Sequence, residues 1–286
     1  MKKEYLFAGI TVILWSTLSA ISKLMIHDMS SMSVLFYTSS IASITLFLIN
    51  IITKGTTFFK IYHVGDYLRI AGLGFLGLFC YTELYYIGLI YLTSQIACII
   101  NYMWPMMIIL FSCIILKETL TVRKLLAITT SFLGMVVITI QNGLGGISFN
   151  SLLGMFACFF AAICYGIYSV FNKKTNYDQW IVLWIAFTVT ALCSGFYCGI
   201  THTFGQLTGI TFAGMLWLGI FVNAIAYVLW GLALNHGDTA KISILAYLCP
   251  FLSLIWGRIL LGEHLSILSF VGLILIIGGV LFQMKE

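Results

Sequence analysis

Ten apolar runs, each long enough to cross a lipid bilayer, divide this sequence from end to end. At about 20 residues each, they cover residues 5–25, 33–53, 68–90, 96–116, 125–141, 152–171, 181–201, 211–234, 242–261 and 267–284. Backbone groups in hydrocarbon must form hydrogen bonds within the chain, so each run is expected to be a helix. The sequence therefore predicts an all-α membrane protein with ten transmembrane helices.

The composition indicates that lipid, rather than water, surrounds most of the chain. Hydrophobic residues make up 61% of it, charged residues 8%, and the mean hydropathy is +1.07. Polar residues are too few to coat a soluble globule. The first run follows Lys2 and Lys3, but it is longer than the apolar part of a secretory signal and lacks a clear cleavage site. We interpret it as a spanning helix.

Basic residues are distributed unevenly between the two ends of the expected helices. If the N terminus is cytoplasmic, twelve lysines and arginines lie inside, and only Lys23 and Arg258 lie at outer helix ends. Cytoplasmic loops carry an excess of these residues. Both termini are therefore predicted to lie on the cytoplasmic side of the plasma membrane. Because no basic stripe is interleaved with aromatic residues, a nucleic-acid partner is not expected.

Cysteine and histidine residues give no sign of a metal centre. The eight cysteines lie inside apolar runs and form no Cys-x-x-Cys pair, and the five histidines lack ligand spacing. No metal and no cofactor are expected. The cysteines are interpreted as small buried apolar residues.

The chain contains an internal duplication. Pro105 precedes Glu118 by thirteen positions, and Pro250 precedes Glu263 by the same number, so the pairs are 145 positions apart. The same shift relates Tyr102 to Tyr247, Leu120 to Leu265 and Gly134 to Gly279. Asn101 and Trp104 have no counterpart, because Ala246 and Cys249 take their places. Recognition chemistry is therefore expected to depend mainly on the first half.

Each half, 1–141 and 152–284, contains five expected helices, and the two halves form one compact domain. Because five is odd, the second half must enter the membrane from the opposite side. A weaker match with a shift of 150 relates Trp15, Ser19 and Lys23 to Tyr165, Ser169 and Lys173. Inverted repeats of this kind let one central site open alternately to each face of the membrane.

The fourth run places polar and aromatic residues near mid-membrane, in the segment Asn101-Tyr102-Met103-Trp104-Pro105. Pro105 has no backbone N–H to donate to the carbonyl of Asn101, so a kink and a free acceptor are expected there. Pro250 is expected to have the same effect beside Tyr247. We interpret the two prolines as hinges on either side of a substrate site, although proline can also serve packing alone.

Aromatic residues in other runs complete the expected site. Tyr81 and Tyr85 share a helix face, as do Tyr227 and Trp230. The candidate substrate-binding residues are Trp15, Tyr81, Tyr85, Asn101, Tyr102, Trp104, Tyr165, Tyr227, Trp230 and Tyr247. Aromatic walls with few charges suit a small molecule with a flat or apolar body. Trp180, Trp184 and Trp217 are instead interpreted as lipid-facing or interfacial residues.

Three glutamates lie close to these helices. Glu83 lies within the third run, where an ionisable group is expected to face the interior of the bundle. It is a candidate for coupling to protons or for binding an amine, but it can also be neutral or paired with a lysine. Glu118 and Glu263 follow the proline-containing helices and are each expected to cap the next helix.

These residues resemble the drug/metabolite transporter superfamily, in particular its EamA type with ten helices in two repeats. Ile13-Leu14-Trp15-Ser16-Thr17 and the segment from Asn101 to Pro105 are similar to the aromatic amino acid exporter branch. The resemblance implies a central basket of helices 1, 3, 4, 6, 8 and 9, with helices 5 and 10 at the periphery. It also implies a cavity lined by Tyr81, Tyr85, Tyr102 and Trp104. Glu83 departs from that pattern.

The function that these features favour is secondary transport of amino acids, aromatic or otherwise neutral, outward by alternating access. The chain is expected to bind a small molecule and to work in the bilayer as a monomer or weak dimer. Export of cationic amines or drugs through Glu83 is the alternative. The sequence has no phosphate-binding loop of the kind an ATP-driven pump needs, and no nucleophile and base of the kind an enzyme needs. A fixed channel explains the repeated prolines less well than a transporter does.

Overall fold

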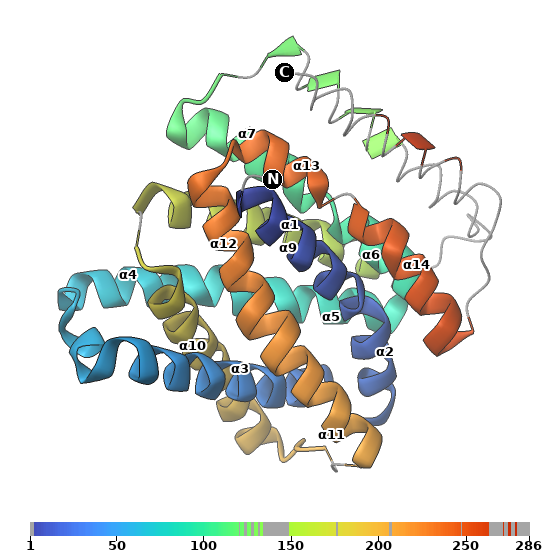
Figure 1. Cartoon of the computed structure of the whole chain (residues 1–286). Coiled ribbons are helices and arrows are strands. Elements are labelled where there is room, and N and C mark those ends of the chain that lie inside the picture. Colours follow the sequence, from blue (N-terminus) through green and yellow to red (C-terminus); the bar gives the residue numbers. More distant parts are fainter. Residues whose placement is uncertain are drawn as a thin grey trace.

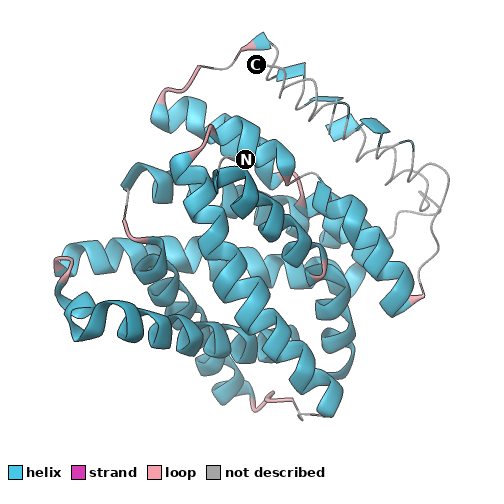
Figure 2. Ribbon diagram, in the orientation of Figure 1, coloured by secondary structure: helices cyan, strands magenta, loops and turns pink. Residues whose placement is uncertain are grey.

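The computed structural model describes residues 3–119, 149–175, 177–205, 208–246 and 248–262. It also describes isolated positions in the two remaining apolar stretches, namely 121, 122, 125, 126, 129, 130, 132, 133, 271, 274, 275 and 278. Every element in these ranges is helical (Figure 2). The predicted runs 125–141 and 267–284 fall largely outside the described residues.

Seven helices in the described part of the chain are long and apolar enough to cross a membrane. They are Lys3–Asp28, Ser31–Lys60, Val64–Tyr91, Phe149–Thr175, Gln179–Thr201, Gly209–His236 and Lys241–Leu261. A shorter apolar helix covers Trp104–Leu116. The prediction of an all-helical membrane fold is confirmed.

Several of these spans are divided into shorter elements (Figure 1). The first half contains α1 (Lys3–Ser16), α2 (Leu18–Asp28), α3 (Ser31–Lys54), η1 (Gly55–Lys60), α4 (Val64–Gly74), η2 (Phe75–Cys80), α5 (Tyr81–Tyr91), α6 (Ser94–Asn101), α7 (Trp104–Phe111) and η3 (Ser112–Leu116). The second half contains α9 (Phe149–Thr175), α10 (Gln179–Thr201), α11 (Gly209–Leu216), η4 (Trp217–Ile225), α12 (Ala226–His236), α13 (Thr239–Leu245) and α14 (Leu248–Leu261).

The boundaries of these elements repeat with the spacing seen in the sequence. α11, α12 and α13 begin 145 positions after α4, α5 and α6, respectively. A π-helical segment precedes both α5 and α12. The duplication is therefore visible in the local backbone geometry of both halves.

α3 and α10 are the second long helices of their halves, and they pack side by side in opposite directions. Ser43 and Thr188 join their hydroxyl groups at 2.7 Å near the middle of the pair. Further along α3, the Asn50 Nδ2 donates to the carbonyl of Trp180 at 3.0 Å. From Ser43 to Asn50 on α3, the contacts on α10 move back from Thr188 to Trp180, so the two helices are antiparallel. The two halves therefore have opposite orientations.

The first helix of each half packs against the third helix of the other half. Thr11 and Trp15 of α1 donate to the carbonyls of Ala226 and Val222, at 3.1 and 3.2 Å. In the equivalent pair, α9 packs on η2 and α5, where a Cβ on Gly77 would collide with the Tyr168 ring. This exchange of helices places residues of both halves in one central core.

Three long helices are interrupted at the level of this core. α6 ends at Asn101 and α7 starts at Trp104, so Pro105 lies in the first turn of a new helix. The expected kink is thus a break, as proline is well accepted in a first turn. α13 similarly ends before α14, which contains Pro250.

The third interruption, at Thr17 between α1 and α2, involves no proline and was not predicted. The hydroxyl groups of Ser16 and Thr17 donate to the carbonyls of Ile13 and Leu14, at 2.7 and 2.8 Å. Such local bonds compete with the helical pattern. The corresponding helix of the second half, α9, is continuous over 27 residues.

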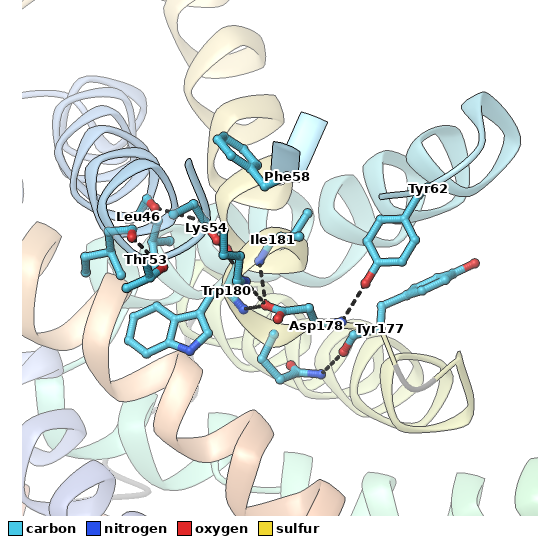
Figure 3. Close-up of polar contacts among 12 residues, drawn as sticks. Leu46, Thr53, Lys54, Phe58, Tyr62, Tyr177, Asp178, Trp180 and Ile181 are labelled. Carbon is cyan, nitrogen blue, oxygen red and sulfur yellow. Dashed lines mark hydrogen bonds and ion pairs between the residues drawn. The ribbon is translucent and has the colours of Figure 1, made fainter. Parts of the chain in front are cut away.

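One end of the bundle carries Lys54, Lys173 and Lys174, and we call it the lysine-rich end. A polar cluster joins the two halves there (Figure 3). Asp178 caps α10 by accepting from the backbone N–H groups of Trp180 and Ile181, and it pairs with Lys54 at 2.7 Å. Nearby, the Tyr177 hydroxyl donates to Asp66 at 2.6 Å, which raises the pKa of Tyr177.

Candidate functional site

The centre of the bundle is filled by aromatic rings from both halves. The Trp15 ring centroid lies 4.9 Å from that of Tyr227, 5.2 Å from that of Trp230 and 5.7 Å from that of Trp104. Trp104 also meets Tyr165 at 5.1 Å. All five side chains are buried. Most of these ring pairs meet edge to face, an arrangement that aromatic pairs favour.

The breaks in the helices determine where this aromatic cluster lies. Trp104 opens α7 directly after the Tyr102–Met103 turn, and Trp15 lies two residues before the break at Thr17. Tyr227 and Trp230 lie in α12, just after the π-helical segment η4. Helix breaks and a π-helical segment therefore lie where these aromatic residues meet.

Two small pockets flank the cluster. The first, the Asn101 pocket, is lined by Trp15, Leu18, Ser19, Tyr81, Tyr85, Cys98, Asn101, Tyr102, Trp104 and Tyr227. The second, the Lys173 pocket, is lined by Tyr165, Tyr168, Ser169, Asn172, Lys173, Gln179, Tyr227, Trp230, Gly231, Leu234 and Asn235. They share Tyr227, and among the described residues no aspartate or glutamate lines either one.

The structure brings nine of the ten predicted binding residues to these two pockets. Only Tyr247 is not placed, because it lies outside the described residues. The three tryptophans interpreted as lipid-facing or interfacial, Trp180, Trp184 and Trp217, lie outside both pockets. Trp184 packs instead among Phe47, Phe58 and Phe59.

The Asn101 pocket contains an acceptor that no described residue satisfies. Asn101 is 1% exposed, and its Nδ2 donates to the Tyr81 hydroxyl at 3.0 Å. Its side-chain carbonyl oxygen has no hydrogen-bond partner in the described part of the chain. A buried acceptor without a donor is costly in an apolar interior.

The Lys173 pocket contains donors. The Trp230 indole N–H and the Tyr168 hydroxyl are buried there without partners among the described residues. Lys173 closes one side, where its ammonium contacts Glu118 at 3.2 Å and also bonds the Thr239 hydroxyl. Glu118 thus reaches a lysine and a threonine of the second half, while the helix that it was predicted to cap lies largely outside the described residues.

Neither pocket is large enough for an organic substrate in this conformation. Each offers about 10 Å³, close to the space that one water molecule needs. The five central rings occupy the intervening volume. The structure is therefore a closed form, and a substrate can enter only if these rings or the broken helices move.

Glu83 lies outside both pockets. Its Oε1 accepts from the Ser31 hydroxyl at 2.7 Å, and its Oε2 is buried with no partner among the residues that the structure describes. The structure thus separates this carboxylate from the Asn101 pocket, although Tyr81 and Tyr85 of that pocket lie within the same long span, Val64–Tyr91.

Comparison with known proteins identifies the family to which this architecture belongs. The model of the EamA-like transporter family matches residues 2–140 and again residues 152–284. This chain belongs to the EamA-like transporter family. It is accordingly a multi-pass membrane protein and a secondary transporter with two EamA domains, rather than an enzyme.

Individual EamA relatives are distant. An uncharacterized transporter of Archaeoglobus fulgidus is 25% identical over 99% of both chains. The aromatic amino acid exporter YddG of Ancylobacter novellus is 27% identical over 64% of each chain. A "Probable amino-acid metabolite efflux pump" of Escherichia coli is 26% identical over 57% of this chain and 58% of its own length. One crystal structure, 20% identical, has a TM-score of 0.83 and covers 99% of both chains.

Sequence reasoning missed several residues of this EamA protein that line the Lys173 pocket, namely Asn172, Lys173 and Gln179. A signal was present, because Tyr165, Asn172 and Lys173 recur at helical spacing on α9. Lys173 also occupies the position that Lys23 has in the first half. The helix face of Tyr165 thus indicates Asn172 and Lys173, whereas Gln179 begins the next helix, α10, and has no such signal.

Proposed function

We propose that this EamA transporter exports neutral amino acids, aromatic ones foremost, across the plasma membrane by alternating access. The observation that carries the proposal is the pairing of two pockets of opposite hydrogen-bonding character around one aromatic cluster. The Asn101 pocket offers a buried acceptor, whereas the Lys173 pocket offers buried donors and an ammonium group. A zwitterion with an aromatic body matches all three features.

The chemistry of each part supports this substrate class. Tryptophan and tyrosine faces accept a flat ring, and they also attract an ammonium group. The Asn101 carbonyl can accept a hydrogen bond from the same ammonium. Because no carboxylate lines either pocket in the described part of the chain, a substrate with a net positive charge would find no counter-ion there.

The orientation is part of the proposal. We place the lysine-rich end in the cytoplasm, together with both termini, because lysine and arginine favour cytoplasmic loops. The direction of transport follows the named relatives, two of which are called an exporter and an efflux pump. One chain contains both pockets, so we expect the monomer to be sufficient for transport.

Alternating access would use the interrupted helices. The breaks at Thr17, at Tyr102–Met103 and before α14 lie beside the central rings, and the halves have opposite orientations. Movement of one half against the other can then expose the Asn101 pocket at one face and the Lys173 pocket at the other. Pro105 and Pro250 lie next to two of these breaks and keep their proposed role as hinges.

A cationic amine or drug is the second candidate substrate. It is favoured by Glu83, whose Oε2 is buried without a partner. An amine that reached Glu83 would bind beside Ser31, away from the aromatic cluster. The two candidates therefore predict different binding residues.

Radiolabelled counterflow in proteoliposomes tests the proposal. Vesicles that contain the purified protein and unlabelled L-phenylalanine should accumulate labelled L-phenylalanine, while protein-free vesicles should not. The panel should also include L-leucine, 2-phenylethylamine and a nucleotide sugar. Exchange of the amine or the nucleotide sugar, with none of either amino acid, would contradict the proposed substrate class.

A further inference from the structure

We propose that the Lys173 pocket is a carboxylate-binding subsite, which takes the acid group of the substrate at the lysine-rich end of the bundle. This inference rests on the proposed function for the identity of the substrate. Its chemistry, a carboxylate bound by Tyr168, Trp230 and Lys173, can be tested without transport.

Two unsatisfied donors point to an anionic acceptor. Tyr168 is 3% exposed and Trp230 is 2% exposed, yet neither the hydroxyl nor the indole N–H has a partner within the ranges that the structure describes. An indole N–H can only donate. Leaving such groups unpaired in an apolar core is unfavourable, and a carboxylate oxygen, which only accepts, would satisfy both.

The surrounding chain packs closely around these donors. A Cβ on Gly231 would collide with the Gln179 side chain, which is 2% exposed and accepts from Asn172 Nδ2 at 2.8 Å. Gly77 likewise makes room for the Tyr168 ring. The amides of Asn172 and Gln179 are thus engaged with each other, and the free donors of Tyr168 and Trp230 remain available to a ligand.

Lys173 supplies the charge. Its side chain is 23% exposed, and its ammonium lies at 3.2 Å from Glu118. A substrate carboxylate that enters the pocket would compete with Glu118 for this ammonium. Glu118 and Thr239 come from the two different halves. Loading of a carboxylate would therefore loosen a link between the halves at the lysine-rich end, as transport requires.

The equivalent positions of the first half lack this chemistry. With a shift of 150, Tyr168 corresponds to Leu18, and Lys173 corresponds to Lys23. The Lys23 ammonium bonds the carbonyls of Leu89 and Leu92, at 2.7 and 2.5 Å, near the C-terminal end of α5. Lys23 does not line the Asn101 pocket. The anion subsite is thus a property of the second half.

Isothermal titration calorimetry on the full chain in detergent tests the subsite with two probes. 3-Phenylpropionate carries the carboxylate without an amine, and 2-phenylethylamine carries the amine without a carboxylate. Tyr168→Phe and Lys173→Gln should each weaken the Kd of 3-phenylpropionate about 10-fold, because each removes a bond to a charged group. The Kd of 2-phenylethylamine should change less than about 2-fold. Glu118→Gln should preserve or tighten 3-phenylpropionate binding.

Thermal unfolding of the same variants separates binding from structure. Tyr168→Phe removes an unsatisfied buried hydroxyl, so it should raise the Tm of the ligand-free protein while it weakens carboxylate binding. Ser39→Ala is the matched control, because Ser39 is buried with an unpartnered hydroxyl outside both pockets. It should change the Tm in the same direction and leave the Kd of 3-phenylpropionate unchanged.

Three results would overturn the subsite. They are an absence of 3-phenylpropionate binding to the unmodified protein, an unchanged Kd in both Tyr168→Phe and Lys173→Gln, or an equal weakening of 2-phenylethylamine. Failure of the proposed function gives a different result. In that case 3-phenylpropionate binding would keep its dependence on Tyr168 and Lys173, but amino acids would show no counterflow.

Discussion

The two pockets occupy equivalent positions in the two halves but differ in chemistry. Trp15 and Ser19 line the Asn101 pocket, while Tyr165 and Ser169, 150 positions later, line the Lys173 pocket. The first ends in a buried amide carbonyl, and the second ends in an indole N–H, a phenol and an ammonium. Duplication has thus preserved the scaffold while the polar groups diverged.

The two halves of a repeat can therefore move symmetrically and still bind different groups of one substrate. The inverted halves require similar backbones, and α11, α12 and α13 indeed begin 145 positions after α4, α5 and α6. A zwitterion requires opposite partners at its two ends. Substitutions in the two pockets are therefore expected to have larger effects than substitutions outside them.

Trp104→Ala should have the largest effect. It removes the ring that meets Trp15, Tyr165 and Trp230, and it leaves a cavity between the two pockets. We expect a loss of at least about 100-fold in the rate of counterflow, together with a loss of about 3–5 kcal/mol in the free energy of unfolding.

Trp184→Ala is the control for Trp104→Ala, because it truncates a packed tryptophan outside both pockets. It should lower the free energy of unfolding but retain counterflow in the protein that reconstitutes. Equal losses of transport in the two variants would show that the central rings have no special role.

Asn101→Leu should weaken binding of 2-phenylethylamine about 10-fold, since the amide carbonyl is the proposed acceptor for an ammonium. The Kd of 3-phenylpropionate should remain within about 2-fold of the unmodified value. Calorimetry of the two probes measures both numbers. If 3-phenylpropionate is the more affected probe, the assignment of opposite ends to the two pockets is reversed.

Glu83→Gln should reduce counterflow of L-phenylalanine by less than about 3-fold, because Glu83 lies outside both pockets and contacts Ser31. The neutral amide can still accept from the Ser31 hydroxyl. If amines are the cargo, their transport should collapse in this variant. Parallel counterflow with L-phenylalanine and 2-phenylethylamine distinguishes the two outcomes.

Asp178→Asn should have the smallest effect. It keeps a side chain that can cap α10 but loses the charge that pairs with Lys54 at 2.7 Å. Because both side chains are partly exposed, we expect a loss of about 0.5–1 kcal/mol in the free energy of unfolding. Counterflow should not change. A large fall in transport would move the functional centre toward the cluster in Figure 3.

The sequence predicted the all-helical membrane fold, and it named nine residues that line the two pockets of the candidate site. Run length and hydropathy predicted the spans, and tyrosine and tryptophan beside Pro105 indicated the central cluster. The break at Thr17 was beyond prediction, because it depends on which of the Ser16 and Thr17 hydroxyls bond to the backbone in the folded chain. Serine and threonine make such bonds in many helices without interrupting them.

The Lys173 pocket was harder to predict for a different reason. Its key property is the absence of partners for Tyr168 and Trp230, and only the packed structure reveals which buried polar atoms are left unsatisfied. The role of Glu118 was also hidden, since its contacts with Lys173 and Thr239 join residues far apart in the sequence. Helical periodicity identifies a face but not the neighbour that will cover it.

The most direct test of one ligand shared by both pockets is a double-mutant cycle on counterflow of L-phenylalanine. The KM should be measured for the unmodified protein, Asn101→Leu, Tyr168→Phe and the double variant. We predict that each single change raises the KM about 10-fold, and that the double variant raises it about 100-fold, since separate contacts with one ligand add. A KM that responds to only one of the two changes would contradict the account.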